Sequence, residues 1–432
     1  MTSRNPVSKD EPIVIVGAGV FGLSTALELK KRGYQNVTVI DRYLPPVIDG
    51  SSVDISRVIR VEYADPLYGK MAREAHQGWV RDYPDHYHES GFVMLANASG
   101  NSYVEKSKDA NKSLGDTLEE YENAHDIRKE FPEIQARLDG MKAYHNKTGG
   151  WADAESSIRQ LANECSLAGV AFITGARGRV TSLRYSGTRV TGVNVAQGDA
   201  IPASQVILAT GAWSNRLLPI SHATSASGQP VGFIRLTPEE SARVAKMPVI
   251  INLSTGVFIF PPTPKTNILK IARHGYGWAT DVEVKDPLGQ ARSVSSPKRD
   301  GNNAASSYLP EDAEQALREG LQQLVPEFAN REWIRRRLCW YSDTPEGDFI
   351  IDHHPVREGL FLATGGAGHA FKFLPVLGRY VADCFENKAP EALRHKWRLR
   401  APDGNKEIVK QGDGSRGGPP LRKLTRAEQA KL

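Results

Sequence analysis

The sequence has few cysteines and no long apolar run. Its 432 residues include three cysteines, Cys165, Cys339 and Cys384. This odd, widely spaced set excludes a disulfide framework and indicates a reducing compartment. No apolar run approaches the roughly 20 residues needed to span a bilayer, and the first ten residues lack the apolar core of a secretory signal. We therefore expect no membrane span and no secretion.

Several catalytic signatures are also missing. Neither the G-x-S-x-G nucleophile elbow nor the Walker A loop occurs. The histidine pairs His86-x-His88 and His353-His354 have no further ligands at metal spacing, so we expect no metal site. The chemistry of this chain must therefore come from another kind of site.

The charge is unevenly distributed along an otherwise ordinary composition. The chain is 40% hydrophobic and 24% charged, as is typical of globular proteins, and it is long enough for two domains. The net charge of +5 lies at the carboxyl end, because residues 391–432 contain eleven basic and five acidic residues. We interpret this segment as a solvated basic tail, and we expect no nucleic-acid-binding face.

The last three residues, Ala430-Lys431-Leu432, are similar to the Ser-Lys-Leu address that a peroxisomal import receptor reads at a free carboxyl end. The polar, glycine-rich stretch 412–420 before them predicts an exposed lead-in. We therefore expect import into the peroxisome, with the cytoplasm as the alternative location.

The amino-terminal part of the chain carries a dinucleotide-binding pattern. Residues 13–16 predict a buried strand, residues 17–22 read G-x-G-x-x-G, and an amphipathic helix follows. A second apolar strand, 37–40, ends in Asp41. A glycine-rich turn alone would leave Asp41 unexplained, whereas a βαβ dinucleotide site accounts for every part of the pattern.

The glycines of this turn have separate roles. Gly17 permits the tight turn, Gly19 lets a pyrophosphate approach the backbone, and Gly22 lets helix and strand pack closely. The pyrophosphate would lie at the amino end of the helix, beside unpaired N–H groups and the positive end of the dipole. Asp41 would accept hydrogen bonds from the adenosine ribose.

Hydrophobic periodicity predicts the remaining elements. Helices are expected at 68–83, 151–168, 310–327 and 368–385. Strands are expected at 91–95, 190–195, 205–209, 249–252, 257–260, 268–271, 349–352 and 360–364, with a strand pair at 171–174 and 180–183. The polar stretch 285–307 is expected to be a surface loop. The strand 205–209 runs into a small-residue turn at Gly211, which is typical of FAD domains.

These elements predict an α/β fold (α+β mixed) with two interleaved domains. FAD-type elements stand at the start, middle and end of the chain, so the dinucleotide domain must be discontinuous. We assign residues 1–60, 145–225 and 335–390 to a glutathione-reductase-like Rossmann FAD domain. Residues 61–144 and 226–334 are assigned to a substrate-binding domain with a mixed, antiparallel sheet, and residues 391–432 to the tail.

Five segments, in order along the chain, carry a family resemblance. They are the glycine turn, SSVDISRVIR (51–60), LKIARH (269–274), LCWYSDTP (338–345) and GHAFKF (368–373). The chain resembles the FAD-dependent amine oxidases of the D-amino-acid-oxidase superfamily, in the branch of monomeric sarcosine oxidase and the fungal fructosyl amino acid oxidases (amadoriases). The resemblance covers about residues 12–390.

The resemblance implies FAD as the cofactor. In this family the cysteine that matches Cys339 is joined by a thioether to the 8α-methyl group of the flavin, which needs a thiolate beside the ring. The alternative is a buried structural cysteine. The flavin contacts implied by the resemblance, beside Gly17, Gly19, Gly22 and Asp41, are Arg42, Ser51, Ser52, Arg57, Val180, Gly211, Gly366, Gly368 and Lys372. For Arg57 the alternative is a surface ion pair.

Lys270 lies in a strand that otherwise has a buried pattern. An ammonium group there is costly unless an anion or hydrogen-bond acceptors compensate it. The resemblance places Lys270 over the flavin ring, where a fixed cation would stabilise the negative charge that forms as O2 accepts its first electron. The alternative is a strand-edge lysine that reaches solvent.

The resemblance also assembles a substrate site from distant segments. It places Arg60 and Lys372 at the substrate carboxylate, one as a bidentate fork and the other as a point charge. Phe258 and His274 are expected beside them. Residues 365–368 are expected to open a helix whose amino end faces the flavin and, with Lys372, favours the anionic reduced ring.

His274 distinguishes the two branches. Amadoriases carry an acid at this position, which holds sugar hydroxyls, whereas sarcosine oxidase has a histidine. Arg60 also resembles sarcosine oxidase, while segments 150–152 and 248–252 and the surroundings of Cys339 are closer to amadoriases. The pocket therefore resembles that of an N-alkyl amino acid oxidase, with a hydrogen-bonded core histidine as the alternative for His274.

We expect a flavoprotein oxidase for carboxylate-bearing secondary amines, that is N-methyl or N-alkyl amino acids. Hydride transfer to FAD would give an imine, and reoxidation by O2 would give hydrogen peroxide. No strong base is evident, and none is needed if the cationic pocket lowers the pKa of the amine so that it binds neutral.

Several alternatives stay open. One is an amadoriase-type oxidase of fructosyl amino acids, and another is a saccharopine or pipecolate oxidase or a biosynthetic oxidase whose imine is trapped by cyclisation. A third is a flavin-binding protein without turnover, or a dehydrogenase that passes electrons to a protein. We expect a monomer whose partners are the amine, O2 and the import receptor. Arg416, in the tail, could reach the pocket as a late arginine does in amadoriases.

Overall fold

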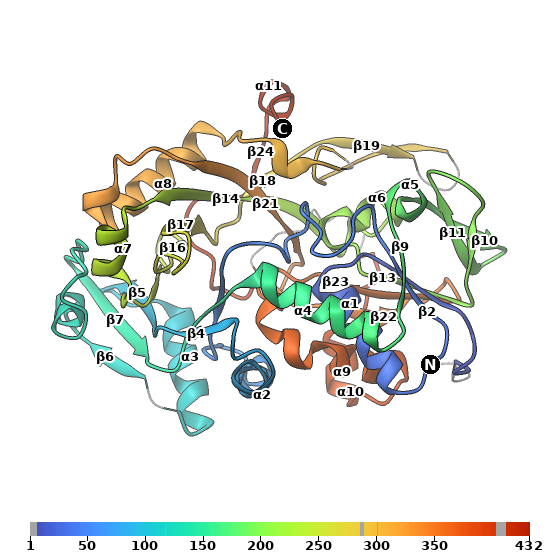
Figure 1. Cartoon of the computed structure of the whole chain (residues 1–432), viewed down its shortest axis with the longest axis horizontal. Helices are drawn as coiled ribbons and strands as arrows, with labels where there is room; N and C mark the ends of the chain where they lie inside the picture. The colour runs from blue at the N-terminus through green and yellow to red at the C-terminus, as the bar shows by residue number, and fades with distance from the viewer. Residues whose placement is uncertain (1–6, 117, 286–288, 300, 403–411) are drawn as a thin grey trace.

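The structure is a computed structural model that describes residues 7–116, 118–285, 289–299, 301–402 and 412–432. Two large sheets, one of six strands and one of ten, together extend along the molecule (Figure 1). Strands β10 (Val180–Ser186) and β11 (Arg189–Val195) lie at one end, and β6 (Glu119–Tyr121) and β7 (Met141–Asn146) lie at the other.

One sheet has six strands in the order β22-β23-β13-β1-β2-β9. β22 is antiparallel to β23, and the other neighbours are parallel. The strands are β1 (Ile13–Val16), β2 (Val37–Ile40), β9 (Ala171–Ile173), β13 (Gln205–Leu208), β22 (Ile350–His353) and β23 (Leu360–Thr364). The mixed α/β fold and its Rossmann-type sheet are confirmed.

Both faces of this sheet are covered, which explains why β1 is apolar along its whole length. Ile13 and Ile15 pack in one core with the helices α1 (Val20–Lys31), α4 (Ala154–Leu167) and α9 (Leu374–Phe385). Val14 and Val16 pack on the other face against the small sheet of β10, β11 and β12 (Ile201–Pro202).

The second sheet has ten strands, and β14 (Ser225–Arg235) lies within it between β17 (Ile268–Arg273) and β21 (Arg335–Asp343). The register places Lys270 opposite Phe233 and Cys339 opposite Gln229, so that only β14 separates Lys270 from Cys339. The other strands, beside β6 and β7, are β5 (Phe92–Asn97), β15 (Val249–Asn252), β16 (Val257–Ile259), β18 (Trp278–Ala279) and β24 (Arg422–Lys423).

Smaller elements complete the fold. A three-stranded sheet is formed by β3 (Arg57–Ile59), β8 (Gly150–Ala152) and β4 (Tyr87–Glu89), and a hairpin by β19 (Val282–Lys285) and β20 (Ala291–Val294). The remaining helices are α2 (Pro66–Asp82), α3 (Ser102–Ser113), α5 (Gly175–Gly178), α6 (Ser214–Leu217), α7 (Pro238–Val244), α8 (Glu311–Leu324), α10 (Glu391–Lys396) and α11 (Arg426–Gln429). No helix in the described ranges has both the length and the apolar character of a membrane span.

Three local predictions were wrong. Segments 171–174 and 180–183 are not a strand pair, because α5 redirects the chain and β9 joins β2 while β10 joins β11. The stretch 285–307 contains β20, whose polar residues still pair with β19. The helix expected at 368–385 begins only at Leu374, after a 3₁₀ turn over Ala370–Phe373. A proline in the first turn fixes that start.

The described parts of the carboxyl-terminal segment, residues 391–402 and 412–432, are not a solvated tail, contrary to the prediction. Trp397 is buried in the first core, Leu424 and Leu432 are buried in the second, and β24 adds to the ten-stranded sheet. The stretch 412–420 is not an exposed lead-in either, because residues 415–417 are buried. The segment packs because acids from distant parts of the chain neutralise its arginines, a pairing that composition cannot show.

Candidate active site

One cavity brings together all but one of the predicted site residues. Its lining includes Gly17, Gly19, Asp41, Arg42, Ser51, Ser52, Arg57, Arg60, Val180, Gly211, Phe258, Lys270, His274, Cys339, Gly366, Gly368 and Lys372. The exception is Gly22, which lies behind the wall, where a Cβ atom would come 1.8 Å from the carbonyl oxygen of Gly17. The packing reason predicted for Gly22 therefore matches its position.

The glycine turn has the form of an anion cradle at the amino end of α1. Gly17 has a φ of +113°, and a Cβ there would lie 2.4 Å from the carbonyl oxygen of Ala209. Gly19 caps α1 without a side chain, and the N–H of Val20 donates to Ser52 Oγ at 2.9 Å. Backbone donors at the positive end of a helix suit a pyrophosphate.

Asp41 lies at the end of β2, as predicted. Its Oδ2 accepts a hydrogen bond from the N–H of Ala18 at 2.8 Å, and its Oδ1 accepts one from the N–H of Arg42 at 2.7 Å. These bonds fix the carboxylate on the cavity wall beside the glycine turn. Each oxygen retains a lone pair for a ribose hydroxyl. The cradle, the carboxylate and the long cavity together fit an adenine dinucleotide.

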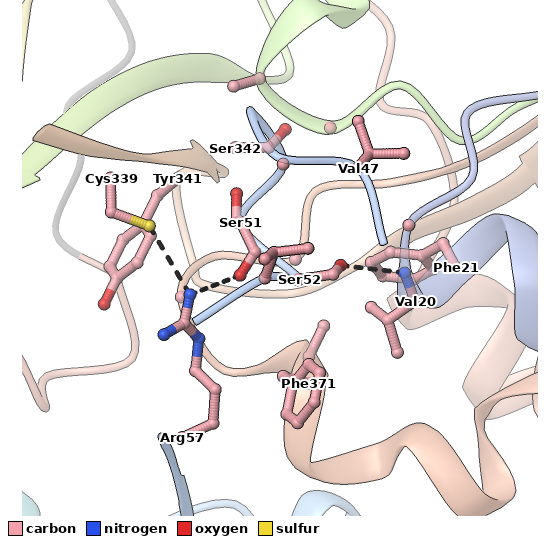
Figure 2. Close-up of a pocket in the computed structure, with 18 of the residues that line it drawn as sticks. Val20, Phe21, Val47, Ser51, Ser52, Arg57, Cys339, Tyr341, Ser342 and Phe371 are labelled. Carbon is pink, nitrogen blue, oxygen red and sulfur yellow. Dashed lines mark hydrogen bonds between the residues drawn. The ribbon is translucent and has the colours of Figure 1, made fainter. Parts of the chain in front are cut away.

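Arg57 links the segment 51–57 to Cys339 in β21 (Figure 2). Its guanidinium donates to the carbonyl oxygen of Ser51 at 2.5 Å and to Cys339 Sγ at 3.7 Å. It also pairs with Asp54 at 2.6 Å. Arg57 therefore lies within the cavity wall and is not a surface ion pair.

Lys270 is buried in the cavity wall, with 2% of its side chain exposed. Its Nζ lies 2.9 Å from Asp54 Oδ2 and donates to the carbonyl oxygen of Ser56 at 2.6 Å. Burial lowers the pKa of Lys270 to about 7, although Asp54 opposes that change. The lysine is therefore not a strand-edge residue that reaches solvent.

Asp54 is the anion that a buried lysine requires, and sequence reasoning did not assign it a role. Burial alone would raise its pKa, but the charges of Lys270, Arg57 and Arg337 outweigh burial and hold that pKa well below its usual range. The signal was present in the sequence, because Asp54 lies three residues before Arg57 in a segment already singled out.

Arg60 and Lys372 meet at the other end of the cavity. Arg60 donates to the hydroxyl of Tyr103 at 3.0 Å, and its other terminal nitrogen, NH1, is buried and forms no hydrogen bond within the described part of the chain. Lys372 Nζ donates to the hydroxyl of Tyr63 at 2.8 Å. Burial and the nearby Arg60 lower the pKa of Lys372 well below its usual range. Two neighbouring cations that repel each other form a site for an anion.

A directed chain of hydrogen bonds holds Lys372. His369 Nε2 faces the carbonyl oxygen of Gly347 at 2.7 Å and must therefore carry its proton there. Burial lowers the pKa of His369 to about 3, so the ring is neutral and Nδ1 accepts from the hydroxyl of Tyr63 at 2.9 Å. Tyr63 consequently presents its lone pairs to Lys372.

His274 lies in the wall and is held from both sides. Its Nδ1 lies 3.3 Å from the Tyr341 hydroxyl, and its Nε2 lies 3.0 Å from Ser415 Oγ. Ser415 Oγ donates to Asp413, so it accepts from His274 Nε2–H, and Nδ1 accepts from Tyr341. Burial lowers the pKa of His274 to about 3, which keeps the ring neutral. Ser415 and Asp413 were not predicted, because only the fold brings the tail to this wall.

Arg416 does not extend into the cavity. It is buried and forms a bidentate pair with Asp343, at 2.6 and 3.0 Å. It also donates to the carbonyl oxygens of Gly275 and Ala367. It therefore lies behind the cavity wall and does not reach the pocket, and both of its terminal nitrogens are engaged by the protein.

Comparison with known proteins identifies the family. The family model described as FAD dependent oxidoreductase (DAO) matches residues 12–384. The chain belongs to this family. The oxidoreductase is 34% identical over 416 residues to L-saccharopine oxidase of Schizosaccharomyces pombe, covering 92% of this chain and 94% of that one. It is 24% identical over 379 residues to a monomeric sarcosine oxidase of a Bacillus species, covering 86% and 91%.

Solved structures agree with this assignment. The oxidoreductase superposes on the deglycating fructosamine oxidase of Aspergillus fumigatus, Amadoriase II, in complex with FSA, with a TM-score of 0.84 and 29% identity. The match covers 98% of this chain and 100% of that one. The predicted family, and FAD as the cofactor of that family, are confirmed.

The pairing of Lys270 with Asp54 predicts a pH dependence for the oxidoreductase. Lys270 is an ammonium below its pKa of about 7 and loses that charge as the pH rises. Aerobic reoxidation of the reduced enzyme should therefore slow as the pH rises through about 7. Asp54→Asn removes the opposing charge, so the midpoint should move about 1–3 units lower. Stopped-flow reoxidation across pH measures this, and an unchanged midpoint in Asp54→Asn would contradict the assignment.

Proposed function

We propose that this chain is an oxidase of carboxylate-bearing secondary amines, namely N-methyl or N-alkyl amino acids, which yields an imine and hydrogen peroxide. The observation that supports it is the pair of cations, Arg60 and the buried Lys372, in the same cavity as Lys270 and Cys339. The names of the relatives, a saccharopine oxidase and a sarcosine oxidase, agree with a secondary amino acid as substrate.

Each residue has a distinct part in this proposal. FAD, when bound, accepts the two electrons and the hydrogen lost from the C–N bond and passes electrons to O2. Arg60 offers its unused N–H group, and Lys372 its ammonium, to the carboxylate. Their positive charge lowers the pKa of the substrate amine, so that it binds neutral with no protein base. Lys270 supplies a positive charge for the reaction with O2.

A substrate screen coupled to peroxide detection tests the proposal. N-methyl amino acids, pipecolate, saccharopine and fructosyl-valine should be compared with the purified, FAD-loaded protein in air. Peroxide from N-alkyl amino acids is the expected result. Activity on fructosyl-valine alone would favour an amadoriase, and reduction without peroxide would favour a dehydrogenase. An imine product recovered in cyclised form would indicate a biosynthetic role.

The carboxylate clamp predicts a loss of activity in a single variant. Arg60→Met keeps an unbranched apolar stem but removes the guanidinium and its hydrogen bonds to the carboxylate, so kcat/KM should fall by about 10–100-fold. Steady-state kinetics with an N-methyl amino acid measure this, and the corresponding amine without a carboxylate should show little change. Arg159→Met, at an exposed ion pair of α4, is the matched control. Equal losses on both substrates would contradict the role of Arg60.

The family resemblance of Cys339 leads us to propose a thioether to the flavin. Cys339 lies in the cavity wall, 6% exposed, with the Arg57 guanidinium 3.7 Å from its sulfur. Such a bond requires a thiolate beside the flavin ring. Acid-precipitated wild-type protein should therefore stay yellow, and Cys339→Ser should give a colourless pellet. A colourless wild-type pellet would mean that the flavin is held without a covalent bond.

Import into the peroxisome through Ala430-Lys431-Leu432, as a monomer, completes the proposal. Leu432 is buried in the second core, so the import receptor could bind it only after it is released from that core. Fluorescence microscopy of the full chain, compared with a Leu432 deletion, tests the location.

A further inference from the structure

One face of the ten-stranded sheet forms a wall of the cavity, and the strand register shows how its lining residues follow one another. Cys339 lies in β21, which pairs with β14. Val231 in β14 lies opposite Ala272 in β17, which in turn lies opposite Phe258 in β16. Phe258 lies opposite Ile251 in β15. All five residues line the cavity, so this wall extends from Cys339 across β14, β17 and β16 to β15 (Figure 1).

The end of this wall away from Cys339 is apolar. Five residues line the cavity there and are here called the apolar surface: Val58, Phe92, Ile251, Phe258 and Phe260. Phe92, Ile251 and Phe260 are buried in one core, and the rings of Phe258 and Phe260 meet edge to face with their centroids 5.6 Å apart. Phe258 is only partly buried and packs both against this core and against the neighbouring cluster on β14 and β17. Phe258 therefore presents apolar surface inside the cavity.

The carboxylate clamp lies beside the apolar surface. The central carbon of the Arg60 guanidinium is 5.7 Å from the centre of the Phe92 ring. Arg60 directly follows β3, and Val58 in that strand packs against the same core as Phe92. An amino acid held by its carboxylate at Arg60 therefore has the apolar surface within reach of its side chain.

The cavity offers no anion to a positively charged side chain at this end. Among the described residues that line the cavity, Asp41 is the only acid, and it lies beside the glycine turn at the dinucleotide end. The charged residues nearer the substrate end are basic and include Arg57, Arg60, Lys270 and Lys372. An ammonium group on the substrate side chain would lose hydration without gaining an anionic partner, which costs free energy.

The apolar surface and the clamp together define a substrate class. We propose, on the basis of the proposed function, that the substrate is an N-alkyl derivative of an amino acid with a large apolar side chain, such as that of phenylalanine or leucine. Its carboxylate binds Arg60 and Lys372, and its side chain covers Phe258 and Ile251. Burial of apolar area on both partners then favours this substrate over sarcosine, which has no side chain.

Two comparisons measure the effects of size and charge separately. N-methyl-L-phenylalanine should exceed sarcosine in kcat/KM by about 10–100-fold, the effect of burying an aromatic side chain. N-methyl-L-2-aminoheptanoate and Nα-methyl-L-lysine have side chains of equal length that end in a methyl or an ammonium group. The first should exceed the second in kcat/KM by about tenfold or more. Peroxide formation by the FAD-loaded protein in air measures both ratios.

Variants of Phe258 test whether the apolar surface causes these preferences. Phe258→Ala should reduce the ratio of kcat/KM for N-methyl-L-phenylalanine over sarcosine by about tenfold, and Phe258→Leu should keep most of that ratio. Phe258→Glu places an acid in the apolar surface and should shift the second comparison toward the lysine derivative. Phe172→Ala is the matched control, because Phe172 is a partly buried residue of the edge strand β9 and does not line the cavity. Equal losses on both substrates in Phe258→Ala would overturn the inference.

Binding gives a second readout that does not depend on turnover. Heptanoate and 6-aminohexanoate carry no secondary amine and differ in the same terminal group, so perturbation of the flavin spectrum gives their Kd values. Heptanoate should bind about tenfold more tightly. A protein that oxidises none of the N-methyl compounds would reject the proposed function, while the ratio of Kd values would still decide the role of the apolar surface. Oxidation that favours sarcosine or the lysine derivative, or ratios near one, would overturn the inference and leave the oxidase proposal intact.

Discussion

Replacing Lys270 with methionine should slow the reaction of the reduced enzyme with O2 by about 10²–10³-fold, the effect of removing a preorganised electrostatic group. Methionine has an unbranched, flexible side chain and fills most of the space that the lysine stem occupies. Lys270 is 2% exposed and supplies a fixed positive charge in the cavity wall. Reduction by the substrate should change little, because Arg60 and Lys372 remain in place. Stopped-flow measurement of the two half-reactions separates these effects.

The fold should survive this substitution. Asp54 keeps its ion pair with Arg57 at 2.6 Å and a longer one with Arg337 at 3.6 Å, so its charge stays compensated. Lys265→Met is the matched control, since Lys265 is exposed in the turn before the same strand. Reoxidation as fast in Lys270→Met as in Lys265→Met would contradict the role of the lysine.

Replacing Arg416 with methionine should reduce the free energy of unfolding by about 3–5 kcal/mol, because it leaves a buried carboxylate without its partner. That carboxylate belongs to Asp343, whose side chain is 1% exposed and also accepts a hydrogen bond from Ser227. Equilibrium unfolding in urea, followed by fluorescence and circular dichroism, measures the change.

A second arginine of the same segment provides the comparison. Arg422 pairs with Asp312 and Glu428, but its side chain is 38% exposed. Arg422→Met should therefore cost no more than about 1 kcal/mol, as expected for surface pairs. Similar losses of unfolding free energy in the two variants would show that the buried pair contributes no more to stability than the exposed pair.

The sequence predicted best what depends on neighbouring residues. The strand, the glycine turn and Asp41 lie within 30 residues, and their hydrogen bonds are local or join adjacent strands. Apart from Gly22, the residues grouped by family resemblance, from Gly17 to Lys372, line one cavity, and β14 brings β17 and β21 together in its wall.

The failures have a common physical cause. Asp54 and Ser415 act through partners that are remote in sequence, Lys270 and His274. The tail was misread because its charge count does not show that acids elsewhere neutralise it. Asp343, for example, holds Arg416 across 73 residues. A motif can indicate that a charged residue is buried, but only the fold shows which residue is its partner.

The pairing of the six-stranded sheet has a consequence for folding. Val16 pairs with Leu208, and Leu208 pairs with Leu362, so the centre of the sheet joins strands from the beginning, middle and end of the chain. Forming such long-range contacts costs the entropy of closing large loops before the contacts stabilise the protein. Folding is therefore slow. A nucleotide can be retained only after those strands have met. We therefore expect excess FAD to increase the yield of refolding by stabilising the finished protein, while leaving the rate of the slowest phase unchanged.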